Sequence, residues 1–298
     1  MKRYVAVIVG GGPAGLAGAL YLARFRRRVV VVDEGDSRAA RIPRTHNVAG
    51  FPNGVVGTEL IALMRRQAEA VGVDFVAARV DALEVDGDGF TARWAGGAET
   101  GRTLLLATGA SDIEPNMPHL AEALKEGALR YCPVCDGFEV VDCDVGVLCN
   151  SSAGLQEAVY LHHFTPRVQV FVTSRDVEWT SDQRREFTER GITLHADPVD
   201  DMRLREGKVV VRHGAHQTVC DSLYSALGMD VHSRLAAAHA AERDAQGYLV
   251  TDRHQQTTIA GLYSAGDVAL GLNQISVGIG AAAVAASAMH LRLSGRAP

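Results

Sequence analysis

The chain has 298 residues, of which 47% are hydrophobic and 22% are charged, and its formal net charge is −5. This length and composition are typical of a folded protein of about two domains, and they exclude a largely disordered chain. The basic residues gather only in a short cluster at Arg24 and Arg26–Arg28. With the net negative charge, this makes nucleic acid an unexpected partner.

The N-terminal segment places Met1–Arg3 before an uncharged run over residues 4–23, as in a signal peptide or a membrane-spanning helix. Gly10–Pro13, three glycines and a proline, lie inside this run. A helix does not carry these residues at its centre without a large loss of stability, so the segment predicts a strand, a turn and a helix. We therefore expect a soluble, cytoplasmic protein with no membrane partner.

Residues 4–33 predict a βαβ unit. An apolar strand is expected over Tyr4–Val9, a helix over Pro13–Phe25 and a second apolar strand over Val29–Asp33. A strand, a tight turn and a helix in this order form the dinucleotide-binding unit of a Rossmann fold.

The glycines of this turn fit the pattern GxGxxG. Gly10 permits the tight turn, Gly12 lets the main chain approach a pyrophosphate at the helix N-terminus, and Gly15 lets the helix pack on the strand. Asp33 follows Gly10 by 23 residues (33 − 10), close to the spacing of about 20 expected for the acid that binds ribose hydroxyls. Glu34 is the less favoured candidate. The sequence predicts a bound dinucleotide but does not say which one.

Cys132 and Cys135 are separated by two residues and followed by Asp136. This spacing lets the two sulfurs close into a small, reducible disulfide. Pro133 fits a turn that enters a helix, whose positive end stabilises a thiolate. The motif predicts a redox-active cysteine pair with an acid beside it.

Two other interpretations of the pair are zinc binding and a structural disulfide. Cys143, Cys149 and Cys220 form no second CxxC, and no histidine pair has zinc-finger spacing, so no metal is expected. Five cysteines are typical of a protein in a reducing compartment, where a lasting disulfide is usually catalytic. Redox chemistry is the favoured interpretation.

Five motifs, taken in order, resemble the low-molecular-weight thioredoxin reductases. They are Gly10–Gly15, Asn47–Pro52, Ala107–Ala110, Tyr131–Phe138 and Gly261–Asp267. The resemblance spans almost the whole chain. It implies FAD in the first Rossmann unit and a homodimer.

The same resemblance implies roles for single residues. Cys135 is expected to face the flavin, Cys132 to exchange with the partner's sulfur, and Asp136 to move the proton that the exchange requires. Besides the three turn glycines and Asp33, the residues expected at the cofactor are Pro13, Ala14, Asn47, Ala107, Thr108, Gly109, Gly266, Asp267, Gln274 and Ile275. Asp267 is expected near the ribityl and pyrophosphate groups.

The resemblance also implies an α/β fold of two Rossmann-like three-layer domains, the second inserted into the first. Pro115 and Pro118 predict a linker, and Val145–Cys149 begins a second strand–turn–helix unit. A return linker is expected near residues 242–247. The FAD domain should then comprise residues 1–115 and 245–298, and residues 116–244 should form the inserted domain, which carries the CxxC motif.

The turn of the inserted domain departs from the family's NADPH motif. Cys149, Asn150 and Ser151 stand where glycines are expected, and the later small residue is Gly154. A Cβ where the main chain must meet pyrophosphate costs about 1–3 kcal/mol. After the strand expected over residues 168–173, only Arg175 is left of the basic residues that grip a 2′-phosphate. The alternative is that Asn150 and Ser151 adopt the turn and still admit a nucleotide.

The favoured hypothesis is an FAD-dependent disulfide oxidoreductase that does not use NADPH. It would take electrons from a ferredoxin-like donor and exchange them with a thioredoxin-like protein or a small dithiol or disulfide. Three alternatives stay open: a dithiol oxidase that passes electrons to oxygen, a conventional NADPH-dependent thioredoxin reductase, and a non-catalytic redox sensor. Asp136 matches the reductases, because the oxidase branch often has a histidine there.

Overall fold

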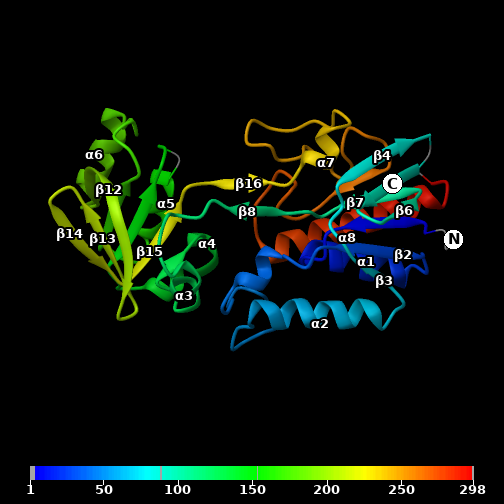
Figure 1. Ribbon diagram of the computed structural model, residues 1–298, viewed down its shortest axis with the longest axis horizontal. Helices are drawn as coiled ribbons and strands as arrows, with labels where there is room; N and C mark the ends of the chain where they lie inside the picture. Colours follow the sequence, from blue (N-terminus) through cyan, green and yellow to red (C-terminus); the bar gives the residue numbers. More distant parts are fainter. Residues whose placement is uncertain (1–3, 88, 153, 297–298) are drawn as a thin grey trace. The chain divides into compact units, whose positions relative to one another are not determined.

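The computed structural model describes residues 4–87, 89–152 and 154–296 (Figure 1). It divides into two compact units. The first comprises Met1–Arg41, Val48–Ser111 and Val231–Pro298, and the second comprises Ile42–Asn47 and Asp112–Asp230. The second unit is thus inserted into the first, and each has its own mixed α/β structure, as the sequence predicted.

The first unit is built on a five-stranded parallel sheet of order β17-β7-β1-β2-β3. Its strands are β1 (Ala6–Val9), β2 (Val29–Asp33), β3 (Asp74–Ala77), β7 (Thr103–Leu106) and β17 (Leu262–Ser264). Helix α1 (Pro13–Arg24) connects β1 to β2, which completes the predicted βαβ unit. Crossover helices place parallel strands side by side, so their carboxyl ends share one edge of the sheet.

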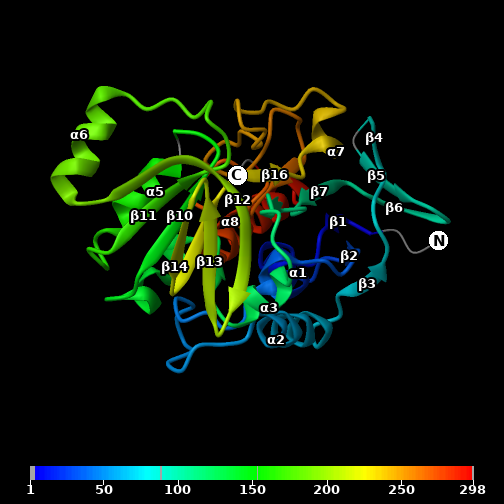
Figure 2. The same cartoon turned by 60° about the vertical axis from the view of Figure 1, so that its left-hand side comes forward.

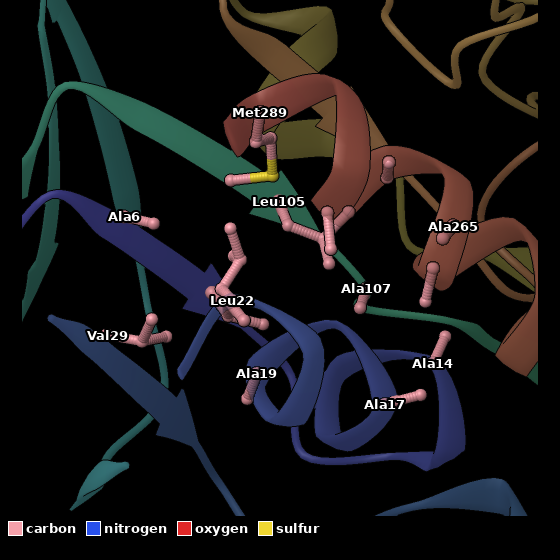
Figure 3. Close-up of a cluster of buried hydrophobic side chains, with 14 of the residues drawn as sticks. Ala6, Ala14, Ala17, Ala19, Leu22, Val29, Leu105, Ala107, Ala265 and Met289 are labelled. Atoms are coloured by element: carbon pink, nitrogen blue, oxygen red, sulfur yellow. The ribbon is translucent and has the colours of Figure 1, made fainter. Parts of the chain in front are cut away.

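Alternation of apolar residues gives this sheet two buried faces. Ile8 and Val31 point toward α1 and α8 (Ile275–Leu293), whose small side chains make one packed core (Figure 3). Val7 and Val30 point to the opposite core. That second face is covered by the antiparallel sheet β4-β5-β6 and by α7 (Arg234–Ala237), while α2 (Gly57–Glu69) lies beside α1. The three strands of that sheet are β4 (Ala82–Asp86), β5 (Gly89–Trp94) and β6 (Gly97–Gly101).

Helix α8 is the only helix in the described ranges that is long and apolar enough to cross a membrane. Its alanines at 282, 285, 286 and 288 are buried against α1 and the sheet. Small side chains on both helices allow this close packing.

The inserted unit contains a seven-stranded sheet of order β14-β13-β12-β11-β10-β15-β9 (Figure 2). Its strands are β9 (Leu129–Arg130), β10 (Val145–Cys149), β11 (Val168–Val172), β12 (Thr193–Arg205), β13 (Lys208–His213), β14 (His216–Cys220) and β15 (Ser222–Ala226). Strands β9, β15, β10 and β11 are parallel to one another, and β11 is parallel to the first part of β12. The rest of β12 forms an antiparallel meander with β13 and β14.

Helices cover both faces of this sheet. Val147 and Val170 face the core that includes α5 (Gly154–Leu161) and α6 (Ser181–Arg190). Leu148 and Phe171 face the opposite core, which includes α3 (Leu120–Lys125). Helix α6 begins with a capping box, because Thr180 and the third helical residue, Gln183, each satisfy the other's backbone N–H.

The boundaries of the inserted unit differ from residues 116 and 244 expected from the sequence. The chain leaves the first unit in β8 (Ala110–Asp112) and returns in β16 (Met229–Val231), and these two strands pair with each other. Residues 231–244 belong to the first unit because Leu235, Ala236 and Ala241 are buried in its core. The prolines at 115 and 118 therefore lie inside the inserted unit.

Candidate active site

The cysteine pair opens a single helical turn. Cys132 and Cys135 form a disulfide, with their Cα atoms 5.2 Å apart. Cys132 is the N-cap of α4 (Pro133–Asp136), and its sulfur accepts a hydrogen bond from the main-chain N–H of Cys135 at 3.2 Å. Since α4 has only four residues and a 3₁₀ turn follows it, the dipole of a long helix does not act on the sulfurs as the sequence suggested.

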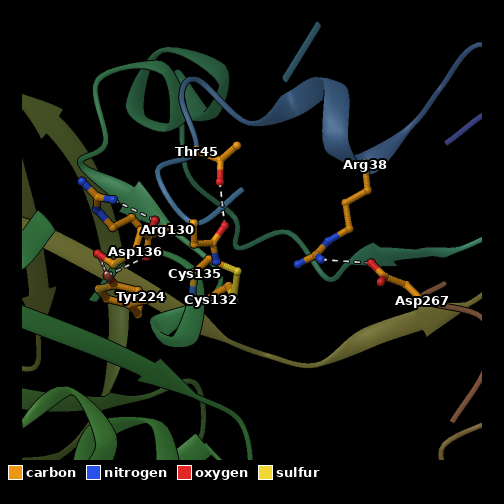
Figure 4. Close-up of a disulfide and its surroundings, with 9 residues drawn as sticks. Arg38, Thr45, Arg130, Cys132, Cys135, Asp136, Tyr224 and Asp267 are labelled. Atoms are coloured by element: carbon orange, nitrogen blue, oxygen red, sulfur yellow. Dashed lines mark hydrogen bonds and ion pairs between the residues drawn. A yellow bond between two sulfur atoms is a disulfide. The ribbon is translucent and has the colours of Figure 1, made fainter. Parts of the chain in front are cut away.

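Asp136 is held by two donors from neighbouring strands. Its Oδ2 lies 2.7 Å from Arg130 Nη1, and its Oδ1 accepts from the Tyr224 hydroxyl at 2.8 Å. Burial raises the pKa of Asp136, while Arg130 and Tyr224 act in the opposite direction. Figure 4 shows the carboxyl group turned toward Arg130 and Tyr224. Its role in proton transfer stays a prediction.

The turn after β1 has the geometry that the glycine pattern requires. Gly10 has φ +105°, and a Cβ there would collide with the carbonyl oxygen of Ala107. A Cβ at Gly15 would collide with the carbonyl oxygen of Gly10. Gly12 is the N-cap of α1, and Pro13 occupies the first helical position, followed by Ala14. The α1 N-terminus thus offers main-chain N–H groups with no acidic side chain in its first turn.

Asp33 ends β2 beside this turn. Its Oδ1 accepts a hydrogen bond from the main-chain N–H of Gly11 at 2.9 Å. The bond fixes the carboxylate and leaves its other oxygen as a further acceptor. The structure therefore brings the predicted acid to the predicted glycine turn.

The remaining cofactor candidates of the first unit come from loops that follow its strands. Gly266, with φ +81°, and Asp267 follow β17, and Asp267 Oδ2 pairs with Arg38 Nη1 at 3.2 Å (Figure 4). Gln274 is the N-cap of α8, and Ile275 begins this helix. Arg38 was not predicted, since no spacing rule connects residue 38 to residue 267.

Ala107, Thr108 and Gly109 follow β7 at the same edge of the sheet. Thr108 Oγ1 donates to the carbonyl oxygen of His232 at 2.7 Å, and the Nε2 of His232 lies 3.1 Å from Ser111 Oγ in a second bond. The Nδ1 atom of His232 lies 3.0 Å from the carbonyl oxygen of Thr108. His232 was not singled out in the sequence. It follows β16 and thus connects this strand to Thr108 and Ser111, around the start of β8.

Asn47 is assigned to a different unit from the other cofactor candidates. It ends the segment Ile42–Asn47, which belongs to the inserted unit. Its side-chain oxygen accepts from Thr45 Oγ1 at 2.8 Å. Its predicted contact with the cofactor stays a prediction.

The residues of the first unit fit FAD. The glycine turn is a cradle that side chains would fill, the α1 N-terminus would attract a phosphate, and Asp33 would supply an acceptor for ribose hydroxyls. Arg38 adds a cation next to Asp267, which offsets the negative charge of a pyrophosphate.

The corresponding turn of the inserted unit is built differently. Strand β10 runs through Cys149, which pairs with Val172 and Ala226, whereas β1 ends one residue before Gly10. The Cys149 side chain is fully buried, and a Cβ at Gly154 would lie 2.7 Å from its sulfur.

Two polar contacts complete this altered turn. Asn150 Nδ2 donates to the carbonyl oxygen of Leu227 at 2.9 Å. Arg175, the predicted remnant of a phosphate grip, pairs with Asp197 at 3.2 Å. The guanidinium group of Arg175 is therefore already paired with a carboxylate.

Arg130 and Tyr224 were missed in the sequence. Arg130 stands two residues before Cys132, which is a weak signal, and Tyr224 lies in the buried strand β15. A tyrosine hydroxyl in a fully buried strand needs a polar partner, so Tyr224 did carry a detectable signal. Its partner, Asp136, is 88 residues away in the chain.

Comparisons with known proteins agree with this geometry. A family model described as pyridine nucleotide-disulphide oxidoreductase matches residues 4–288. A thioredoxin reductase of Streptomyces coelicolor is 29% identical over 276 residues, covering 88% of this chain and 85% of the relative.

Two solved structures are similar over nearly the whole chain. The structure of HlmI has a TM-score of 0.91 at 29% identity, and the match covers 98% of this chain and 93% of HlmI. A thioredoxin reductase from Streptococcus pyogenes has a TM-score of 0.89 at 26% identity, covering 98% and 99% of the two chains. With a cysteine pair, an FAD-compatible turn and a family model that spans nearly its whole length, the chain belongs to the pyridine nucleotide-disulphide oxidoreductases, as a thioredoxin reductase-like, FAD-dependent thiol–disulfide oxidoreductase.

Proposed function

We propose that this enzyme exchanges electrons between a non-pyridine donor of the ferredoxin type and a thioredoxin-like protein, and that it does not use NADPH. The observation that carries the proposal is the extension of β10 through Cys149. A residue in strand conformation, with its side chain buried, cannot make the tight glycine turn that brings main chain to a pyrophosphate. The pairing of Arg175 with Asp197 supports the same conclusion for the 2′-phosphate.

Cys132 and Cys135 carry out the exchange with the partner. Bound FAD supplies two-electron exchange with this pair. Reduction breaks the Cys132–Cys135 bond and leaves two sulfurs that hold the electron pair, one as a thiolate and one as a protonated thiol.

The thiolate of Cys132 then attacks the partner's disulfide, forms a mixed disulfide and releases one partner sulfur as a thiolate, which takes up a proton. Cys135 attacks the Cys132 sulfur, which restores the enzyme disulfide and releases the reduced partner. A cytoplasmic location and a homodimer are consistent with this activity and stay predictions.

An anaerobic titration of the flavin absorbance tests the proposal. The purified holoprotein is titrated in turn with NADPH, NADH, a reduced ferredoxin and a dithiol. We expect complete bleaching by four equivalents of the one-electron donor per enzyme, two for the flavin and two for the Cys132–Cys135 disulfide, and no rapid bleaching by either nicotinamide nucleotide. Rapid bleaching by NADPH would overturn the proposal and indicate a conventional thioredoxin reductase. Bleaching by the dithiol alone, with the colour returning in air, would indicate a dithiol oxidase.

A further inference from the structure

Arg130, Asp136 and Tyr224 form a cluster that we name the Asp136 clamp. It joins the last residue of α4 to β9 and β15, which are adjacent parallel strands of the inserted unit. All three residues lie within this unit. The clamp therefore connects the redox motif to the sheet that supports it.

Arg130 is fixed from its other side as well. Its Nε donates to the carbonyl oxygen of Gly127 at 3.0 Å and to Ser222 Oγ at 3.1 Å, and Ser222 Oγ donates to the same carbonyl oxygen at 2.9 Å. Gly127 has φ +70°, and a Cβ there would lie 2.8 Å from Arg130 Nη2. The guanidinium group thus has one orientation, with Nη1 directed at Asp136.

Tyr224 holds Asp136 at two atoms. Its hydroxyl lies 3.2 Å from the main-chain oxygen of Asp136 and 2.8 Å from the side-chain Oδ1. The Tyr224 side chain is 0% exposed, so the contact is shielded from water. Hydrogen bonds to an ionised group in such surroundings are stronger than those between neutral groups.

The clamp differs in burial from other ion pairs of the same unit. The side chains of Arg130 and Asp136 are 18% and 28% exposed, whereas those of Arg167 and Asp144 are 50% and 51% exposed. Charges near the surface are screened, and exposed pairs contribute little. A change of charge in the Asp136 clamp should therefore alter the ionisation of nearby groups. Cys135 is one of them, because it directly precedes Asp136.

We propose that Arg130 and Tyr224 are positioning residues that neutralise and orient the Asp136 carboxylate, so that Cys132 and Cys135 can react as thiolates. Without Arg130, a partly buried negative charge would stand beside the pair and oppose the formation of a second negative charge. Glu139, the other acid that acts on Asp136, adds to this opposition. The proposal rests on the redox role proposed for the pair but not on the identity of the electron donor.

The pH dependence of thiol alkylation tests the clamp. The holoprotein, in a Cys143→Ala background that removes the most accessible other thiol, is reduced with a dithiol, freed of it without oxygen, and treated with iodoacetamide across pH 6–10. Mass spectrometry follows the modification of Cys132 and Cys135. In Arg130→Gln we expect the midpoint of the profile to rise by about one pH unit, which is roughly a tenfold slower reaction below the midpoint.

Matched variants distinguish an electrostatic effect on the midpoint of the alkylation profile from a structural effect. Tyr224→Phe should shift the midpoint in the same direction by less, and Arg130→Lys should restore part of the loss. The double variant Arg130→Gln/Asp136→Asn should return the midpoint toward that of the parent. Arg167→Gln, which breaks the exposed ion pair of the same unit, should leave it unchanged.

Two results would overturn the proposal: an unchanged midpoint in folded Arg130→Gln, or a double variant as impaired as the single one. If Arg130→Gln does not fold, the same comparison is made between Tyr224→Phe and Tyr224→Phe/Asp136→Asn. Rapid bleaching of the flavin by NADPH would refute the donor proposed above and leave this readout intact, because the thiols are reduced chemically.

Discussion

Gly10 and Cys149 occupy corresponding places in two strand–turn–helix units, but only Gly10 adopts a left-handed main-chain conformation. Gly10, at φ +105°, turns the chain directly after β1. Cys149 instead continues β10 and pairs with strands on both sides. The two units therefore share a topology, but only one has the turn that cradles a pyrophosphate.

Restoring glycines to the second turn should improve the binding of NADPH. The variant Cys149→Gly/Ser151→Gly removes the side chains where main chain must approach the phosphates, and we expect affinity to rise about tenfold or more. Isothermal titration calorimetry with NADPH measures the change. Cys220→Ala, which alters another buried cysteine of the same unit, is the control. Unchanged affinity would mean that the pairing of Arg175 with Asp197 is the main obstacle.

Adding a methyl group at Gly10 should abolish FAD binding. Gly10→Ala forces a Cβ into the Ala107 carbonyl oxygen and requires a strained φ. The ratio of flavin to protein absorbance in the purified variant should fall to near zero. Gly35→Ala also has a positive φ, but nothing lies within 4 Å of its Cβ. If both variants lose FAD equally, main-chain strain rather than the shape of the cradle is responsible.

Arg38 should matter for FAD through charge. Arg38→Gln removes the ion pair with Asp267 near the expected pyrophosphate, and we expect FAD to bind about tenfold more weakly, ~1.4 kcal/mol. Fluorescence titration of the apoprotein with FAD at low salt gives the dissociation constant. Arg65→Gln, which breaks an exposed pair with Glu69 in the same unit, should bind FAD like the parent. Equal losses in the two variants would argue against a local role for Arg38.

Glu157 should make the inserted unit less stable as the pH rises. Burial, followed by the charge of Asp112, raises the pKa of Glu157 from 4.5 to about 7. The folded unit therefore holds a proton that the unfolded chain releases at lower pH, so stability falls between about pH 4.5 and 7. Above pH 7 the cost is on the order of 3 kcal/mol.

Glu157→Gln should remove this dependence and unfold at a higher urea concentration at pH 8 than the parent. In a Trp94→Phe background, the fluorescence of Trp179 reports on the inserted unit alone. Glu189→Gln, at an exposed position of α6, serves for comparison. A parent protein as stable at pH 8 as at pH 5 would contradict the prediction.

Cys135→Ser should trap the partner. If Cys132 attacks the substrate disulfide, this variant cannot resolve the mixed disulfide and should accumulate a covalent complex with an oxidised thioredoxin-like protein. Non-reducing electrophoresis and mass spectrometry identify the bond. Cys132→Ser is the paired control and should form no such complex. A complex with Cys132→Ser alone would reverse the roles of the two cysteines.

Local patterns predicted most of the first unit. The apolar strands around Gly10–Gly15 and the acid at residue 33 obey spacing rules within one βαβ unit, and the structure confirms their order. The strand expected over Tyr4–Val9 forms over Ala6–Val9, and the helix expected over Pro13–Phe25 forms over Pro13–Arg24. Strand and helix ends shift by a few residues because capping contacts, not periodicity, decide them.

Contacts between segments that are distant in the chain were not predicted from the sequence. Tyr224 and Asp136 are joined across 88 residues, and Arg38 and Asp267 across 229. Nothing in local composition connects such pairs, since their distance follows from strand order. The boundary at residue 231 was missed for a similar reason. It depends on the burial of Leu235 in the core of the first unit, which is a tertiary contact, whereas the expected linker was based on local composition.

The pairing of β8 with β16 makes residues 113–228, the larger part of the inserted unit, a removable module. Adjacent strands lie about 5 Å apart, so the chain leaves and re-enters the first unit at neighbouring points. A two-residue hairpin turn can bridge such a gap. Replacing residues 113–228 with Asn-Gly should therefore yield a miniature flavoprotein, with the bonds of His232 to Thr108 and Ser111 closing its new hairpin. In evolutionary terms, two paired strands are a suitable place to insert or exchange a domain, because the chain leaves and returns at one point of the host unit.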